Sequence, residues 1–89
     1  ILFRRHSKFM PYFIYILECV DKTLYVGATN NLEKRLKEHN KAKSGAHYTK
    51  IRRPVKLKYH EKFKTLRKAL RREFEIKSWP RKKKLELIK

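Results

Sequence analysis

The sequence predicts an α+β domain: a small, mainly antiparallel three-stranded sheet flanked by helices, in the order β-β-α-β-α-α. Strand-like runs of β-branched and aromatic residues occur at residues 12–20, 23–28 and 55–63. Helical periodicity with capping residues occurs at residues 31–42, 65–77 and 81–88. A chain of 89 residues has room for one small domain with a modest core. We assign that domain to residues 10–89 and treat residues 1–9 as a leader or extension outside the fold.

The first predicted strand is nearly all apolar. Residues 12–20 read Tyr-Phe-Ile-Tyr-Ile-Leu-Glu-Cys-Val, which is typical of a central strand covered on both faces. Cys19 falls within this run and is interpreted as a small core residue rather than a reactive thiol. Residues 21–22 are expected to turn the chain, so that residues 23–28 return as an antiparallel partner.

The first helix carries polar groups on its inner stripe. Asn30 is a good N-cap, and Glu33 stands three residues later, where a capping box requires it. Arg35 and His39 are four residues apart and interleave with two leucines on the core-facing side. A guanidinium and an imidazole in such positions indicate either a buried ion pair or a functional site.

Residues 41–54 are predicted to form a polar loop in which basic residues surround an aromatic one. This composition suits contact with phosphates and with a base. A solvated connection between helix and strand is an equally good interpretation. If the loop binds nucleic acid, the candidate contact residues are Lys43, His47, Tyr48, Lys50, Arg52 and Arg53.

The last third of the chain is expected to form an edge strand and two helices. Residues 55–63 alternate apolar and basic side chains, which indicates a half-buried strand with a basic outer face. Thr65 is placed to cap the following helix, and Ser78 or Trp79 to cap the last one. Glu73 lies on the apolar stripe of its helix, which indicates a site or a structural ion pair. The pairing partner would be Arg35, or the nearby Arg72 and Lys77.

Composition narrows the class of function. The net charge of +18 calls for an anionic partner, and nucleic acid is the commonest one. No stretch approaches the ~20 apolar residues of a transmembrane helix, so we expect no membrane association. A single cysteine excludes internal disulfides and fits the reducing cytoplasm. The chain has no phosphate-binding glycine loop, no zinc-ligand spacing and no serine or cysteine nucleophile motif.

Four motifs resemble those of the GIY-YIG nuclease superfamily. Two tripeptides stand ten residues apart, a helix motif follows them, and a glutamate-containing segment comes later in the chain. The similarity is greatest to small stand-alone bacterial members, relatives of the nuclease domain of the excinuclease C subunit. The first tripeptide departs from the family pattern, because Phe13 stands where the family has glycine. The matching residues are Phe13-Ile14-Tyr15, Tyr25-Val26-Gly27, Thr29-Asn30-Asn31-Leu32 with Arg35 and His39, and Ala69-Leu70-Arg71-Arg72-Glu73.

The resemblance implies a metal-dependent endonuclease that acts on DNA, with branched or damaged DNA in repair or recombination as the candidate substrate. Glu73 would hold one Mg²⁺ or Mn²⁺ ion through its carboxylate oxygens. Tyr15 would act as general base or orient the attacking water, and His39 would share the proton transfer. Arg35 would bind a phosphate oxygen and stabilise developing charge, while Tyr25 would donate a hydrogen bond to phosphate or water.

Two other readings of the residues remain open. The chain could be a basic nucleic-acid-binding module of the same fold without efficient cleavage, which the charge supports equally. Taken singly, Tyr15 and Tyr25 could be core aromatics, and His39 could be bonded to a carbonyl group. The basic final helix is interpreted as facing nucleic acid rather than an acidic membrane. The preferred nucleic-acid structure and the oligomeric state are left open.

The two site tyrosines make a prediction about the hairpin. A regular two-residue turn at residues 21–22 would place Tyr15 and Tyr25 on opposite faces of the sheet, because side chains alternate along a strand. A shared site therefore requires an odd loop or a bulge. We predict a three-residue loop near residues 21–23, or a bulge in one of the two strands.

Overall fold

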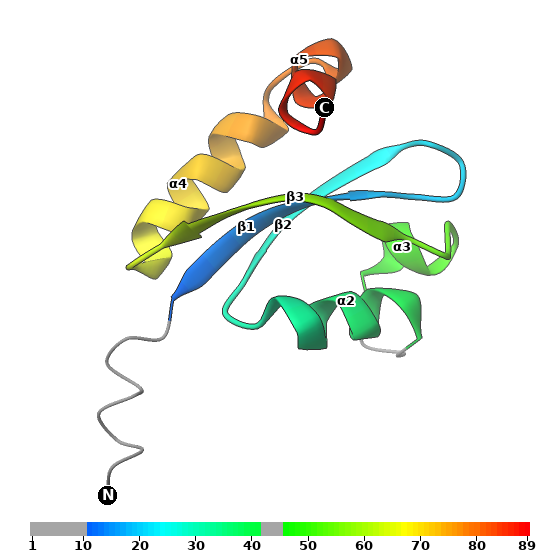
Figure 1. Ribbon diagram of the computed structural model, residues 1–89, viewed down its shortest axis with the longest axis horizontal. Helices are drawn as coiled ribbons and strands as arrows, with labels where there is room; N and C mark the ends of the chain where they lie inside the picture. The colour runs from blue at the N-terminus through cyan, green and yellow to red at the C-terminus, as the bar shows by residue number, and fades with distance from the viewer. Residues whose placement is uncertain (1–10, 42–45) are drawn as a thin grey trace, which may run out of the picture.

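The computed structural model describes residues 11–41 and 46–89. In this part of the chain the sheet has three strands in the order β2-β1-β3, and both pairings are antiparallel. Helices α4 and α5 lie on one side of the sheet and α2 and α3 on the other (Figure 1). The predicted α+β fold and the order of the six predicted elements are confirmed, and one short helix, α3, is added between α2 and β3. The elements are β1 (Tyr12–Glu18), β2 (Leu24–Thr29), α2 (Leu32–Asn40), α3 (His47–Lys50), β3 (Lys56–Phe63), α4 (Leu66–Lys77) and α5 (Arg81–Leu87).

Strand β1 is the centre of the molecule, as its apolar sequence predicts. Ile14 and Ile16 are fully buried on the face that meets α4. Tyr15 and Leu17 are buried on the opposite face, in a second cluster that includes apolar residues of α2. Cys19 is 3% exposed, and burial raises the pKa of its thiol, in keeping with a core residue.

The β1–β2 hairpin has the odd loop that a shared tyrosine site requires. The Cys19 N–H donates to the Thr23 carbonyl at 2.9 Å, so residues 20–22 form a three-residue loop. Lys22 adopts the left-handed conformation, with φ of 71°. The loop lies one residue earlier than predicted, but its parity is as required: Tyr15 pairs with Gly27 and Leu17 with Tyr25. Tyr15 and Tyr25 therefore occupy one face.

Strand β3 lies at an edge of the sheet, as predicted, but its apolar side chains do not all lie on the same face of the sheet. Ile16 pairs with Tyr59 whereas Leu17 pairs with Leu57, which leaves Lys58 as a bulge. Tyr59 consequently packs with the α4 cluster, and Leu57 packs with the α2 cluster. The prediction of one continuous apolar face for residues 55–63 was wrong, because a period-2 pattern cannot show a bulge that switches the face.

Helix α2 begins one residue later than predicted. Its N-cap is Asn31, whose Oδ1 accepts from the Lys34 N–H at 3.0 Å; Asn30 is exposed and is not the cap. The Thr29 hydroxyl oxygen accepts from the Asn31 N–H at 3.1 Å, which orders the strand end and delays the helix. Two adjacent asparagines are equivalent by propensity, so only the neighbouring threonine contact distinguishes them.

Three other termini were tested by the structure. Thr65 caps α4 as predicted and accepts from the Lys68 N–H at 3.2 Å. Pro80 occupies the N-cap of α5, so neither Ser78 nor Trp79 is the cap; the Ser78 hydroxyl instead donates to the Glu75 carbonyl at 2.6 Å and closes α4.

Residues 41–54, predicted to be a loop, contain α3. None of the helices in residues 11–41 and 46–89 is long and apolar enough to cross a membrane.

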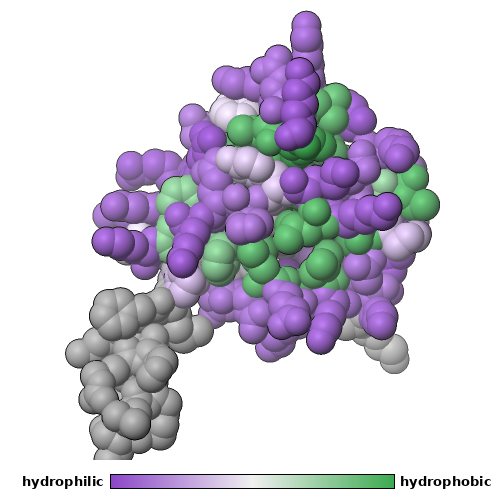
Figure 2. Space-filling view, viewed as in Figure 1, coloured by the Kyte–Doolittle hydropathy of each residue, from purple (hydrophilic) through white to green (hydrophobic). Residues whose placement is uncertain are grey.

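Leu87 and Ile88 of the C-terminal segment pack onto the α4 cluster and extend that core. In the face drawn in Figure 2, apolar residues gather from the α5 region across the middle, and hydrophilic side chains surround them. The prediction that residues 1–9 lie outside the fold concerns a segment outside the described residues.

Candidate active site

Tyr15 lies across Gly27 of the neighbouring strand. A Cβ added at position 27 would overlap the Tyr15 hydroxyl and ring. The glycine is therefore required here by the close approach of a side chain, since its φ is not in the left-handed region. The open backbone lets the phenol extend from the central strand over β2, which is the free edge on that side.

A buried chain of hydrogen bonds joins Tyr15, His39 and Thr49. The Thr49 hydroxyl donates its single proton to the Ala46 carbonyl at 2.9 Å. Towards His39 Nδ1, 2.7 Å away, Thr49 Oγ1 must therefore act as acceptor, which places the imidazole proton on Nδ1. His39 Nε2 then carries the lone pair and accepts from the Tyr15 hydroxyl at 2.8 Å. The proton positions of all three side chains therefore follow from a single hydrogen bond, the one that Thr49 donates to the Ala46 carbonyl.

Electrostatics keep both partners of this pair neutral. Burial, followed by the positive charges of Arg35 and Arg53, lowers the pKa of His39 to about 4, although Glu38 opposes the shift. Burial raises the pKa of Tyr15 to about 12; the charges of Tyr25 and Glu73 add to this, and a hydrogen bond from Arg35 opposes it. At neutral pH the pair is a phenol donating to a neutral imidazole, and the phenol has an acceptor ready for its proton.

Arg35 connects this buried pair with the surface. Its Nη1 donates to Glu38 Oε1 at 2.7 Å, and its guanidinium also hydrogen-bonds the Tyr15 oxygen. The Arg35 side chain is 27% exposed, whereas Tyr15 is 2% exposed. Arg35 thus offers a partly exposed cation next to the Tyr15 hydroxyl, where an anion at the surface can bind.

Tyr25 completes an aromatic cluster on the same face. Its ring centroid lies 5.0 Å from that of His39 and 6.4 Å from that of Tyr15. The ring centroid of Tyr48, on α3, lies 6.0 Å from that of Tyr25. The Arg52 guanidinium carbon lies 3.9 Å from the centroid of the Tyr48 ring. The structure therefore brings together Tyr15, Tyr25, Arg35 and His39, and it places Tyr48, one of the predicted nucleic-acid contacts, half-buried next to them.

Glu73 comes from the other layer, on α4. Its carboxylate is 18% exposed and pairs with Lys77 at 3.2 Å, one helical turn away. Arg72, the other neighbour considered, instead binds Glu61 through two hydrogen bonds of 3.0 Å. The charge of Glu73 is the smallest of the contributions that raise the pKa of Tyr15 in the first cluster.

The donor set around Glu73 fits a divalent cation that keeps most of its water ligands. Among the described residues no group of three or more histidine, cysteine, aspartate or glutamate side chains could hold a metal ion. A single hard carboxylate is how Mg²⁺ is usually held beside a phosphate, because the ion dehydrates reluctantly and takes substrate oxygens as further ligands. Lys77 would have to be displaced from the carboxylate or share it.

The predicted nucleic-acid contacts divide into exposed and structural residues. His47 and Lys50 are exposed on α3, and Lys43 lies outside the described residues. The Arg52 guanidinium donates to the Tyr48 carbonyl and to Asp21, both at 3.1 Å. Arg53 donates to the carbonyls of His39 and Glu38 at 2.6 and 3.0 Å and so satisfies the end of α2. Nucleic-acid contact by these residues stays a prediction.

Sequence reasoning missed Thr49. It follows Tyr48 in a polar segment and stands ten positions from His39. In the sequence it is distinguished only as a residue type that is common in turns. Nothing in its local pattern marks it. The structure gives it a role because α3 folds back against α2 and buries its hydroxyl completely.

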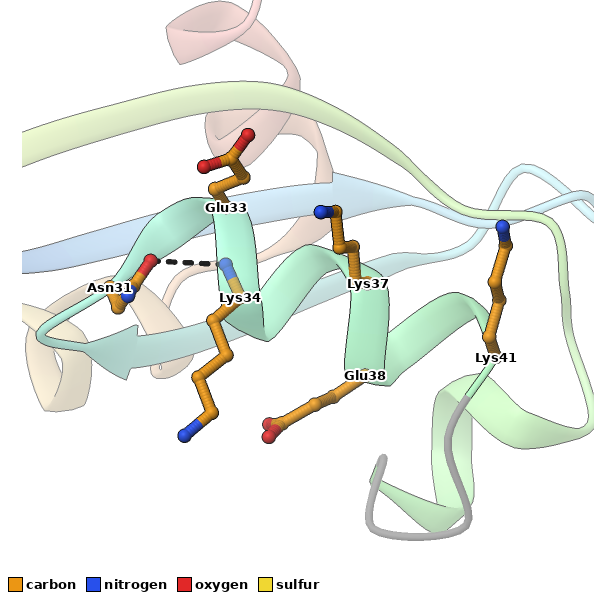
Figure 3. Close-up of a pocket in the computed structure, with 6 residues that line it drawn as sticks. All are labelled: Asn31, Glu33, Lys34, Lys37, Glu38 and Lys41. Carbon is orange, nitrogen blue, oxygen red and sulfur yellow. Dashed lines mark hydrogen bonds between the residues drawn. The ribbon is translucent and has the colours of Figure 1, made fainter.

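A hollow lies on the outer side of α2, and Glu38, the ion-pair partner of Arg35, is one of its lining residues. It has a volume of about 450 Å³ and is lined by Asn31, Glu33, Lys34, Lys37, Glu38 and Lys41. Figure 3 shows these side chains projecting outward in different directions, with the Asn31 cap bond as the interaction drawn between them. Mixed charges that do not converge are typical of a solvated helix face rather than a binding site.

The fold and the cluster together define a class of protein. The chain matches the model of the GIY-YIG catalytic domain over residues 11–86, and it belongs to this family, which is a family of nucleases. Among its relatives, the UPF0213 protein of Syntrophus aciditrophicus is 58% identical over 77 residues, which cover 86% of this chain and 88% of the relative. The UPF0213 protein of Bacillus pumilus is 53% identical over 73 residues, which cover 82% of this chain and 74% of the relative.

A solved structure agrees with the fold. The solution NMR structure of a UPF0213 protein from Bacillus halodurans is 38% identical, with a TM-score of 0.57. The match covers 89% of this chain and 83% of that one. The family and the small size of these relatives agree with the resemblance found in the sequence.

Proposed function

We propose that this protein is a divalent-metal-dependent endonuclease that hydrolyses phosphodiester bonds of DNA. The observation that carries the proposal is the directed hydrogen-bond chain from Tyr15 to His39 to Thr49. A tyrosine whose proton already points at a neutral imidazole can take up a second proton as it releases its own. Membership of a nuclease family supports the same conclusion.

The proton path follows from the bonds. Water attacks phosphorus and passes a proton to Tyr15 Oη, while the original phenol proton moves to His39 Nε2. The phosphorus–oxygen bond to the leaving sugar breaks, that oxygen takes up a proton from solvent, and His39 Nε2 then returns its extra proton to solvent. Because the pKa of Tyr15 is about 12, a free phenolate is scarce at neutral pH, so a transfer in which Tyr15 relays the proton is favoured.

The remaining residues bind and orient the phosphate. Arg35 would donate to a non-bridging oxygen and balance the charge that develops there. Tyr25 would donate a hydrogen bond to the phosphate or to the water. Glu73 would hold one Mg²⁺ or Mn²⁺ ion, which supplies Lewis-acid stabilisation of the phosphate and leaving oxygen when bound.

The second candidate function is a nucleic-acid-binding module without efficient cleavage. The Lys77–Glu73 ion pair favours it, because an internal cation already neutralises the only carboxylate assigned to the metal. The charge of +18 supports binding under either proposal.

A comparison of two glutamates on α4 separates the two functions. Glu73→Gln should lower cleavage of supercoiled plasmid and of a branched oligonucleotide about a hundredfold or more in Mg²⁺ or Mn²⁺, while DNA binding in chelator persists. Glu75→Gln is the matched control, since Glu75 lies two residues away with a side chain 54% exposed. Cleavage that survives Glu73→Gln contradicts the metal role assigned to Glu73, and tight binding without cleavage by the unaltered protein contradicts the nuclease proposal and supports the binding module.

A further inference from the structure

Helix α4 carries a stripe of large apolar side chains that no other described element covers. Leu66 and Leu70 are each 45% exposed, and Phe74 is 78% exposed. They are spaced four residues apart and therefore lie along one side of the helix. We call Leu66, Leu70 and Phe74 the α4 stripe. Contiguous exposed apolar side chains, unlike single scattered ones, indicate an interaction surface.

The α4 stripe lies next to Glu73 on the β2 side of the helix. Ala69 and Ile76 are fully buried and mark the side that faces the sheet. Arg72 binds Glu61 of β3, which fixes the β3 side. Successive residues are ~100° apart around a helix, so Glu73 falls on the opposite flank, towards β2, and the stripe follows immediately beyond it. The influence of the Glu73 charge on Tyr15, whose phenol lies over Gly27 of β2, agrees with this placement.

Cations border the stripe. Arg67 and Arg71 are exposed just beyond it, and Lys77 lies between the stripe and Glu73. A second copy of a chain with charge +18 would bring like charges together on this surface. A nucleic acid matches both features, because phosphates bind the cations while an apolar or aromatic side chain packs against a base face or between base steps.

We propose that the α4 stripe is a base-contacting wedge beside the candidate active site, with Phe74 as its tip. The inference rests on the proposed function and names its substrate class: DNA in which a nucleotide near the cut is unpaired or easily unstacked. A regular duplex keeps its bases inside the stack, so it would meet only the cations of this surface. Such a wedge would select bulged, branched or frayed DNA over regular duplex without reading its sequence.

The test measures binding without metal, so that it does not depend on cleavage. The full chain is titrated in chelator against a perfect duplex and against the same duplex with a three-nucleotide bulge, with fluorescence anisotropy as readout. Phe74→Ala should weaken binding to the bulged duplex by about fivefold or more, the range for losing one base–aromatic stack, and change duplex binding by less than about twofold. Phe74→Trp should retain the preference, because indole stacks equally well.

Two further measurements make the result specific. A 2-aminopurine placed in the bulge should be quenched by the unaltered protein and by Phe74→Trp, but not by Phe74→Ala. Val20→Ala is the matched control, because Val20 is an exposed apolar residue (57%) in the hairpin loop, away from α4. Phe74→Ala with equal effects on both DNAs, or with no effect, overturns the wedge and leaves the nuclease proposal standing. Failure of the unaltered protein to bind either DNA overturns both.

Discussion

At the scale of single residues, one hydroxyl group decides the chemistry of the cluster. Thr49 is fully buried, yet its bond to the Ala46 carbonyl determines which nitrogen of His39 carries the proton. Without that bond the imidazole could present an N–H to Tyr15, and the tyrosine would lose its proton acceptor. The position and tautomer of the His39 imidazole are thus set by Thr49, a residue outside the family motifs.

Two substitutions at Thr49 test this role. Thr49→Val keeps the size of the side chain and removes the hydroxyl, so we expect cleavage to fall about tenfold or more. Thr49→Ser keeps the hydroxyl and should restore most of the rate. Nitrogen-15 NMR shifts of His39 should show the Nδ1–H tautomer in the unaltered protein and in Thr49→Ser, but not in Thr49→Val. An unchanged tautomer and rate in Thr49→Val would contradict the assignment.

The neutral state of His39 also predicts how stability depends on pH. The pKa of His39 is about 4 in the folded chain and ~6.5 when unfolded, so the unfolded state binds the proton first as the pH falls. The stabilisation is complete above pH ~6.5 and is lost as the pH falls towards 4. Between pH 7 and 4.5 the free energy of unfolding should fall by about 2 kcal/mol more for the unaltered protein than for His39→Gln, as measured by urea unfolding. Equal losses would contradict burial of a neutral imidazole.

At the scale of the element, α2 is held at both ends by side chains. Asn31 caps its first turn, and Arg53 satisfies the carbonyls of its last turn. Asn40, its last residue, exchanges two hydrogen bonds with the Val55 backbone at 2.7 and 3.1 Å. These bonds hold Arg35 and His39 in position against β1, which a short helix of mainly polar residues would not achieve by propensity alone.

The two adjacent asparagines allow a controlled test of the α2 cap. Asn31→Ala should lower the free energy of unfolding by about 1 kcal/mol, because the Lys34 N–H loses its acceptor. Asn30→Ala should change it by less than about 0.5 kcal/mol, because Asn30 is exposed and is not the cap. Urea unfolding of both variants measures the difference. A larger effect at Asn30 would place the start of the helix where the sequence predicted it.

At the scale of the whole molecule, charge and layering act together. The net charge of +18 is spread over a chain whose two cores lie on either side of one central strand. Tyr15 reaches β2 from one layer, and Glu73 stands on the β2 side of the other, so the candidate site belongs to the β2 edge and to both layers. An anionic polymer along that edge would relieve repulsion among the cations.

Binding should therefore depend steeply on salt. Each phosphate neutralised on duplex DNA contributes about −0.9 to the slope of log affinity against log salt concentration. We expect affinity for duplex DNA to fall about tenfold or more between 50 and 200 mM salt, measured by anisotropy in chelator. Arg71→Gln should make the slope shallower by about one phosphate contact. An affinity independent of salt would exclude phosphate contacts as the main source of binding.

Local chemistry determined most of the architecture. The apolar run of β1, the alternation of β3 and the Thr65 cap of α4 are short-range patterns, because periodicity and capping depend on residues within a few positions of one another. The odd hairpin loop was also predictable, since the shared tyrosine face left no other parity. The candidate cluster of Tyr15, Tyr25, Arg35 and His39 could be proposed from motif spacing.

Only the tertiary structure decided the details that join distant parts of the chain. The Lys58 bulge moves half of β3 to the other face, Thr49 meets His39 across ten residues, and Arg72 binds Glu61 of β3 rather than Glu73. In each case several local arrangements are close in free energy. Contacts made after folding select among them, so no pattern in the neighbouring sequence carries the answer.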